Sequence, residues 1–158
     1  MLPAMAVIRD VVEADLPIFF EHQRDPEAAR MAAFPSRDRE AFMAHWQKIL
    51  ANDEVTKKTV LSDEGEVAGN IGIFDGDEKR LVGYWIGREF WGKGLATKAL
   101  AEALAEEKTR PIHAYVATSN LGSVRVLEKC GFTFVSRETE FNDALGEDIE
   151  EALYVLDA

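Results

Sequence analysis

One stretch of the sequence, residues 81–104, constrains the fold more than any other, because it predicts a strand, a glycine turn and a helix in immediate succession. Residues 81–86 are mostly aliphatic, aromatic or β-branched, which favours a largely buried strand. Gly83 interrupts this run, and a glycine inside a strand marks a bulge or a close approach by another backbone or a ligand. Farther on, small and apolar residues recur at helical spacing and predict an amphipathic helix: Ala96, Ala99, Leu100, Ala103 and Leu104.

The turn between this strand and this helix has glycines at alternate positions, Gly92 and Gly94. Residues without bulk let the backbone curl so that successive N–H groups point into one concavity. A helix that begins at such donors attracts an anion, because the unsatisfied N–H groups and the helix dipole both favour negative charge. Arg88 and Lys93 add positive charge. We therefore expect the main-chain N–H groups of residues 92–97 to bind a pyrophosphate, the alternative being a tight turn with no ligand.

Two common phosphate-binding loops do not fit this turn. A dinucleotide fingerprint needs G-x-G-x-x-G, and Thr97 stands at the third glycine; a loop of the form G-x-x-x-x-G-K-S/T is absent. The turn instead resembles the acyl-CoA loop of the GNAT superfamily of N-acyltransferases, Q/R-x-x-G-x-G/A, with Trp91, Gly94 and Ala96 at the defined positions. A tryptophan at the first position is similar to the branch that contains the ribosomal-protein N-terminal acetyltransferases.

A second segment, residues 120–132, resembles a later signature of the same superfamily, N-x-x-A-x-x-x-Y-x-K-x-G-F. Ser123 stands where alanine is common, as it does in the N-terminal-acetyltransferase branch, and Leu127 stands where many members carry a tyrosine. Two partial motifs in the right order are harder to obtain by chance than either alone. The matching positions are Asn120, Lys129, Gly131 and Phe132.

The whole chain, residues 1–158, is predicted to form a single domain. The resemblance implies an α+β (mixed α/β) GNAT-like fold, in which helices flank a central mixed, mostly antiparallel sheet in the order β-α-α-β-β-β-α-β-α-β-β. Residues 25–37 have no clean period and predict a short helix or an ordered loop. We expect strands at 6–11, 59–61, 67–74, 81–86, 112–116, 132–141 and 152–156, a polar turn at 142–148, and helices at 13–23, 39–50, 96–104 and 121–129.

In GNAT folds the strands corresponding to 81–86 and 112–116 run parallel but splay apart, and the pantetheine arm of acetyl-CoA enters the gap. The resemblance implies that a backbone N–H near Tyr84 or Trp85 faces the thioester carbonyl and that Ile86 pairs with pantetheine. Ser123 would protonate the leaving thiolate, the alternative being a small polar residue that only packs there. The catalytic candidates are thus Ser123 and Tyr84. The cofactor-binding candidates are Trp85, Ile86, Arg88, Gly92, Lys93, Gly94, Leu95, Ala96, Thr97, Asn120 and Arg125, with no metal.

Two of these assignments have plain structural alternatives, and the acceptor side is less defined. Asn120 opens a helix, so its side chain either caps the helix or reaches the pantetheine amide. Arg125 either meets the adenosine 3′-phosphate or is simply solvated. The general base is open: Glu21, His22, Asp25 and Glu27 lie in the region that shapes the acceptor pocket in the family. Met31, Phe34 and Trp46 either line that pocket or pack in the core.

The expected function is acetyl transfer from acetyl-CoA to a primary amine, a small molecule or a peptide, by direct attack in a ternary complex. The alternatives are a non-catalytic acyl-CoA-binding or sensing domain and an enzyme of another nucleotide. The net charge of −11 argues against nucleic acid and anionic membrane surfaces and permits a cationic acceptor, although acidity also keeps a domain soluble. The lone Cys130 excludes an internal disulfide and favours a reducing cytoplasm. The oligomeric state stays open, a homodimer included.

Overall fold

The computed structural model describes residues 7–33, 36–143 and 145–158. These residues build one seven-stranded sheet in the order β1-β2-β3-β4-β5-β7-β6. The strands are β1 (Ile8–Asp10), β2 (Thr56–Leu61), β3 (Val67–Gly76), β4 (Lys79–Ile86), β5 (Ile112–Ala117), β6 (Thr133–Asn142) and β7 (Glu147–Leu156). The α-helices are α1 (Leu16–Arg24), α2 (Pro26–Ala32), α3 (Arg39–Ala51), α4 (Leu95–Glu106) and α5 (Leu121–Lys129), with short 3-10 turns η1 (Glu13–Asp15) and η2 (Arg88–Phe90).

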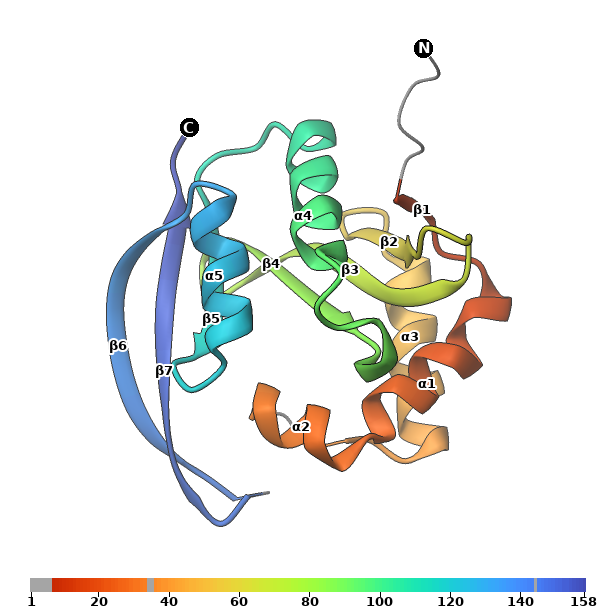
Figure 1. The fold of residues 1–158 in the computed structure, drawn as a ribbon, viewed down its shortest axis with the longest axis horizontal. Coiled ribbons are helices and arrows are strands. Elements are labelled where there is room, and N and C mark those ends of the chain that lie inside the picture. The colour runs from red at the N-terminus through yellow and green to blue at the C-terminus, as the bar shows by residue number, and fades with distance from the viewer. Residues whose placement is uncertain (1–6, 34–35, 144) are drawn as a thin grey trace.

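The sheet is antiparallel except where β4 meets β5. These two strands are parallel and share a single bridge, between Leu81 and His113. Beyond that bridge they diverge, as Figure 1 shows, so the splay that the GNAT resemblance implies is present. By contrast, β3 and β4 pair in unbroken register through Gly83, which lies opposite Gly72. Gly83 is therefore not a bulge.

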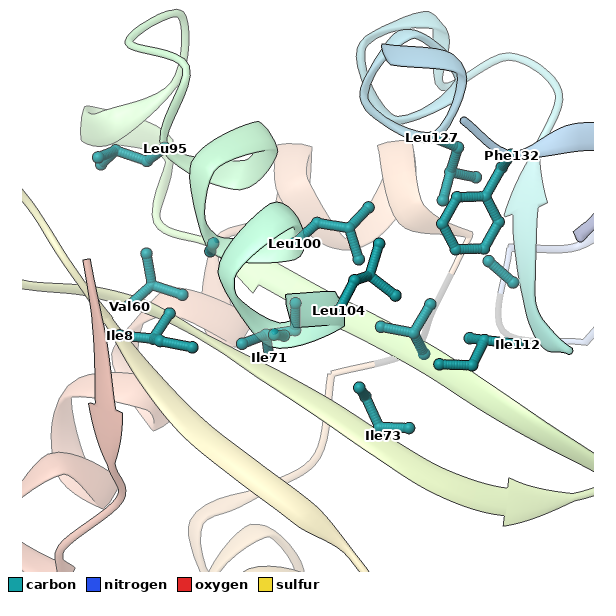
Figure 2. Packing of buried hydrophobic residues seen from close by; sticks show 14 of the residues in the cluster. Ile8, Val60, Ile71, Ile73, Leu95, Leu100, Leu104, Ile112, Leu127 and Phe132 are labelled. Carbon is teal, nitrogen blue, oxygen red and sulfur yellow. The ribbon is translucent and has the colours of Figure 1, made fainter. Parts of the chain in front are cut away.

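One face of the sheet is covered by α4 and α5, which lie in front of it in Figure 1. The buried stripe of α4 packs on Ile71 and Ile73 of β3, and Leu127 and Phe132 extend the same cluster toward β5 (Figure 2). Each large aliphatic side chain buried there contributes about 1.5–3 kcal/mol relative to exposure. The helical side chains of α4 in this cluster are those that the sequence period predicts from Ala99 onward, together with Leu95.

A second apolar cluster belongs to the helices at the N-terminal end of the chain. Leu16, Phe19 and Phe20 of α1 pack against Phe42 and Trp46 of α3, with the Phe19 and Trp46 ring centroids 5.1 Å apart. The helix α1 also sits directly on the end of β4. A Cβ atom at residue 87 would lie 2.6 Å from the ring of the α1 histidine, so only a glycine lets the helix approach this closely.

The structure decides one open alternative and corrects two sequence-based boundaries. Of the short helix or ordered loop expected at 25–37, the helix is present as α2, because the side chain of Asp25 caps it by accepting the N–H of Glu27 and a proline follows the cap. The second strand begins at residue 56 rather than 59, since its polar first half pairs with β3. The turn expected at 142–148 was too long: β6 and β7 pair from Asn142 and Glu147 onward. Their polar residues hide the strand period because both strands are solvent-exposed there.

The first strand falls at Ile8–Asp10, inside the predicted 6–11, and residue 6 lies outside the described residues. Among the described helices, none combines the length and apolarity needed to cross a membrane. In the same described parts of the chain, no group of three or more histidine, cysteine or acidic side chains is arranged to hold a metal ion.

Candidate active site

The glycine turn forms the N-terminal end of α4. Gly92 and Gly94 have φ angles of 78° and 76°, in the left-handed region that residues with side chains rarely adopt. Gly94 is the N-cap residue, and in the described chain no side chain caps this end and no acidic residue lies in the first turn. The first N–H groups of α4 have no intrahelical acceptors, so they remain as donors for an anion.

A cavity of about 420 Å³ lies beside these donors. It brings together the residues predicted for cofactor and catalysis from three elements, β4, the start of α4 and the start of α5. It also takes in residues of α2, which the sequence left undefined, including the predicted Met31. The predicted residues in its wall are Tyr84, Trp85, Ile86, Gly92, Gly94, Leu95, Ala96, Thr97, Asn120, Ser123 and Arg125.

Two predicted cations lie outside this wall. The Arg88 guanidinium forms an ion pair with Asp25 at 3.0 Å and a second with Glu27, which ties η2 to the start of α2. The Lys93 ammonium lies 5.7 Å from the centre of the Phe90 ring. Arg88 is therefore held largely by local acids. The positive charge in the cavity wall itself comes from Arg125 and Lys129 of α5.

Trp91 shows what replaces the usual glutamine or arginine of the acyl-CoA loop. Its indole N–H donates to the carbonyl of Ile86 at 2.8 Å. Gly87 pairs with Ala68 of β3, and alternate residues of an antiparallel strand face opposite edges, so Ile86 turns its N–H and C=O toward β5. The indole thus joins the loop to the open edge of β4, at the residue where pantetheine pairing is predicted.

Asn120 and Ser123 are organised by the start of α5. The Asn120 side-chain oxygen accepts the N–H of Ser123 at 3.2 Å, so the predicted capping role is confirmed. Contact between Asn120 and the cofactor stays a prediction. A cap of this kind fixes the first turn of the helix and with it the Ser123 hydroxyl.

Tyr84 meets Ser123 across the gap between β4 and α5. The two hydroxyl oxygens are 2.7 Å apart. Tyr84 lies opposite Ile71 in the ladder, so its side chain points to the α4–α5 side of the sheet. Burial raises the pKa of Tyr84 to about 12, although the hydrogen bond with Ser123 opposes that rise. The phenol therefore keeps its proton at neutral pH.

The sequence singled out Tyr84 for its backbone N–H and gave no expectation that its hydroxyl meets Ser123. The signal was present in the alternation of β4: a residue next to Trp85 faces the opposite side of the sheet. The position where the family often has a tyrosine is Leu127, and its side chain is only 1% exposed in the core. The only tyrosine in the wall of the smaller cavity, within the described residues, is thus Tyr84 on β4.

A larger cavity of about 720 Å³ opens on the other face of the sheet. Aromatic residues of α3, β3, β4 and β5 line much of it, including Phe42, Trp46 and Tyr115, and Glu151 of β7 lies in its wall. The two cavities share Ala32, Tyr84, Trp85, Asn120 and Ser123. They therefore approach each other at the splay between β4 and β5, where the Tyr84–Ser123 pair lies.

The four residues considered as a general base lie outside both cavity walls in the described chain. Glu21 forms an ion pair with Arg24, and Asp25 and Glu27 form ion pairs with Arg88 of η2. Burial lowers the pKa of His22, so its imidazole is neutral at neutral pH. Of the predicted pocket residues, Met31 lines the smaller cavity and Trp46 the larger one. Phe34 lies outside the described residues.

Known proteins resemble this chain in sequence and in fold. The Bacillus subtilis (strain 168) protein named "Putative ribosomal N-acetyltransferase YdaF" is 31% identical over 101 residues, 60% of this chain and 55% of that protein. The chain spans about half the length of the curated relatives it matches.

Solved acetyltransferase structures share the fold. Spermidine N-acetyltransferase from Vibrio cholerae, in complex with CoA and spermine, gives a TM-score of 0.83 at 16% identity, covering 95% of this chain and 94% of that chain. Ribosomal-protein-alanine N-acetyltransferase from Brucella melitensis gives 0.80 at 19% identity, covering 96% and 99%. The sequence model of the acetyltransferase (GNAT) domain matches residues 6–133. The chain therefore belongs to the GNAT acetyltransferase family, a family of enzymes.

Proposed function

We propose that this protein is an acetyl-CoA-dependent N-acetyltransferase that moves an acetyl group to a primary amine by direct attack in a ternary complex. The observation that carries the proposal is the position of the Tyr84–Ser123 pair, at the place where the two cavities approach each other. One cavity begins at the free N–H groups of α4, and the other opens on the opposite face. A cofactor and an acceptor can thus meet at one proton-carrying pair.

In this proposal, the residues of the smaller cavity hold coenzyme A. The N–H groups of residues 92–97 bind its pyrophosphate, with Arg125 near the adenosine 3′-phosphate. The Ile86 edge of β4 pairs with the pantetheine arm, and the Asn120 side chain is close enough to the same gap to take part. A backbone N–H of β4 near Tyr84 stabilises the oxyanion that forms on the thioester carbonyl.

The chemical step then uses the Tyr84–Ser123 pair as a proton relay. The amine nitrogen forms a bond to the acetyl carbonyl carbon, and the C–S bond breaks with its electron pair on sulfur. Ser123 gives a proton to the thiolate, Tyr84 resupplies Ser123, and the pair recovers a proton from the nitrogen that becomes the amide. The sum is one amine and one thioester converted to one amide and one thiol.

The larger cavity is the proposed acceptor site. Its aromatic wall and the carboxylates of Asp75 and Glu151 suit an amine that carries an apolar or extended body. The names of the relatives point to two such acceptors, a ribosomal protein N-terminus and a polyamine. Either would present a primary amine to the gap.

The test is a thiol-release assay with acetyl-CoA and a panel of peptides and small amines, accompanied by calorimetry with CoA. We expect CoA binding and amine-dependent thiol release with at least one acceptor. Absence of CoA binding at millimolar concentration would refute the proposal. Tight CoA binding with no turnover on any amine would instead favour a non-catalytic acyl-CoA-binding domain.

A further inference from the structure

The edge of β4 that faces the gap ends at Ile86, the last residue of the strand. Gly87 donates its N–H to the Ala68 carbonyl of β3 at 2.8 Å, and successive residues of an antiparallel strand face opposite edges. The N–H and C=O groups of Tyr84 and Ile86 therefore point away from β3. Within the described residues, the one bridge to β5 lies farther back in β4, so these groups face the gap rather than a neighbouring strand.

The outermost acceptor of this edge is already occupied by Trp91. The indole N–H of Trp91 donates to the Ile86 carbonyl at 2.8 Å. Beyond Ile86 the chain leaves the edge, because Gly87 faces β3 and η2 follows it. The Ile86 carbonyl is thus the last acceptor that β4 presents to the gap, and the indole closes it. Trp91 is 37% exposed in the wall of the smaller cavity, so its ring lies where a bound ligand would pass.

The position of Trp91 is fixed by the turn that precedes it. The N–H of Phe90 donates to the Gly87 carbonyl at 2.9 Å, and the N–H of Trp91 donates to the Arg88 carbonyl at 3.1 Å. Phe90 is buried in the main apolar cluster, and the Arg88 side chain forms an ion pair with Asp25 at 3.0 Å. A hydrogen-bonded turn with a buried anchor therefore holds the backbone of residue 91 and directs its indole back to β4.

We propose that Trp91 is a positioning residue that fixes the register of the pantetheine arm on β4. This inference rests on the proposed acetyltransferase function, in which the arm pairs with this edge. Because the arm carries amide groups, it can pair with the edge in more than one register. Equivalent groups on one edge are two residues apart, so a slip of one step moves the ligand by about 6.4–6.8 Å. Such a slip carries the thioester away from the Tyr84–Ser123 pair.

The indole prevents the outward slip. If the Ile86 carbonyl were unoccupied, an amide N–H of the slipped arm would find an acceptor there and gain one hydrogen bond, which shifts an equilibrium about three- to tenfold. With the indole in place, that acceptor is used and the ring occupies the path. The arm then pairs inward from the Ile86 N–H, which leaves the thioester carbonyl beside the N–H of Tyr84. Trp91 itself takes no part in the bond-forming step.

The experiment measures kcat and the KM for acetyl-CoA by thiol release in the wild type, Trp91→Phe and Trp91→Ala. The first variant removes the indole N–H, and the second also removes the ring, so each exposes the Ile86 carbonyl. Cofactor bound in a slipped register is non-productive, and it lowers kcat and KM by the same factor. We expect both constants to fall about three- to tenfold, with kcat/KM unchanged to within about twofold. Calorimetry should show CoA bound as tightly as in the wild type or up to about tenfold more tightly.

NMR of the indole groups shows whether Trp91 stays on Ile86 when the cofactor binds. The chain has three tryptophans, so one Trp→Phe variant for each assigns the three indole N–H signals. The Trp91 signal should exchange slowly with solvent in the free protein and equally slowly with CoA bound. Faster exchange in the complex would mean that the cofactor displaces the indole, and it would overturn the proposal.

A surface aromatic residue supplies the control. Phe141 is 61% exposed on β6 and lies outside both cavity walls of the described chain, so Phe141→Ala should keep the wild-type kcat and KM. Melting temperatures near that of the wild type would show that the Trp91 variants are folded. A wild-type kcat in both Trp91 variants, or a rise in their KM for acetyl-CoA, would contradict the role given to Trp91. If the wild type itself binds no CoA or turns over no amine, the proposed function has failed instead.

Discussion

The hydroxyl of Tyr84 offers the sharpest test of the site, through the substitution Tyr84→Phe. The change removes one oxygen that lies 2.7 Å from the Ser123 hydroxyl and leaves the aromatic ring in place. Loss of one intramolecular hydrogen bond costs about 0.5–1.5 kcal/mol of folding free energy, so the variant should fold. Any larger effect must then appear in the chemistry.

The expected kinetic loss follows from the leaving group. General acid catalysis contributes about 10²–10⁴-fold, and a thiol with a pKa near 8.5 needs less help than a poorer leaving group, so the lower end applies. We therefore expect kcat to fall about 10²-fold, equivalent to ~2.7 kcal/mol of transition-state stabilisation, with CoA affinity unchanged. Ser123→Ala should show a similar loss, and the double variant should lose little more, because the two hydroxyls form one relay.

The assay is steady-state thiol release, with Tyr154→Phe as the matched control. Tyr154 is a buried tyrosine of β7 that lies outside both cavity walls in the described chain, so its variant should keep full activity. A Tyr84→Phe variant that retains kcat within twofold of the wild type would refute the proton relay. It is equally refuted if the losses in the double variant multiply.

Further predictions follow from other parts of the structure. Gly94→Glu should cost about 1 kcal/mol because of the positive φ, and calorimetry should show CoA affinity at least tenfold weaker; Gly146→Glu, also at positive φ in the β6–β7 turn, should leave affinity unchanged. Raising the pH from 10 through about 12 should remove the stability that neutral Tyr84 contributes, since its folded pKa lies above the unfolded value, and Tyr84→Phe should lack this loss in denaturant titrations. Burial alone would raise the pKa of Asp15, but hydrogen bonds from Arg9, Thr59 and the Val12 N–H leave it below 3.8; stability should therefore fall as the pH drops below 3.8, and Asp15→Asn should flatten that decline. Leu127→Ala should lower the free energy of unfolding, measured by chemical denaturation, by about 2–5 kcal/mol. An unchanged free energy of unfolding would show that this side chain does not belong to the core.

Local patterns were enough to predict the central part of this protein. The strand, glycine turn and helix over residues 81–104 follow from residue type and period alone, because a buried strand and an amphipathic helix each leave their own spacing in the sequence. The two short motifs then identified the family, which the match over residues 6–133 confirms. The patterns were weakest in α2 and in the β6–β7 hairpin, whose residues are mostly exposed and have no apolar period to read.

The sequence by itself determined that a helix begins at the glycine turn near residues 92–97 and that the fold is a GNAT sheet. Only the tertiary structure decided which side chains meet. It brought the Tyr84 hydroxyl to within 2.7 Å of the Ser123 hydroxyl, 39 residues away, and it paired Glu151 of β7 with Ala117 of β5. The reason is physical: spacing along a chain fixes which face a residue takes, whereas strand order and register fix its neighbours, and these depend on the packing of the whole sheet.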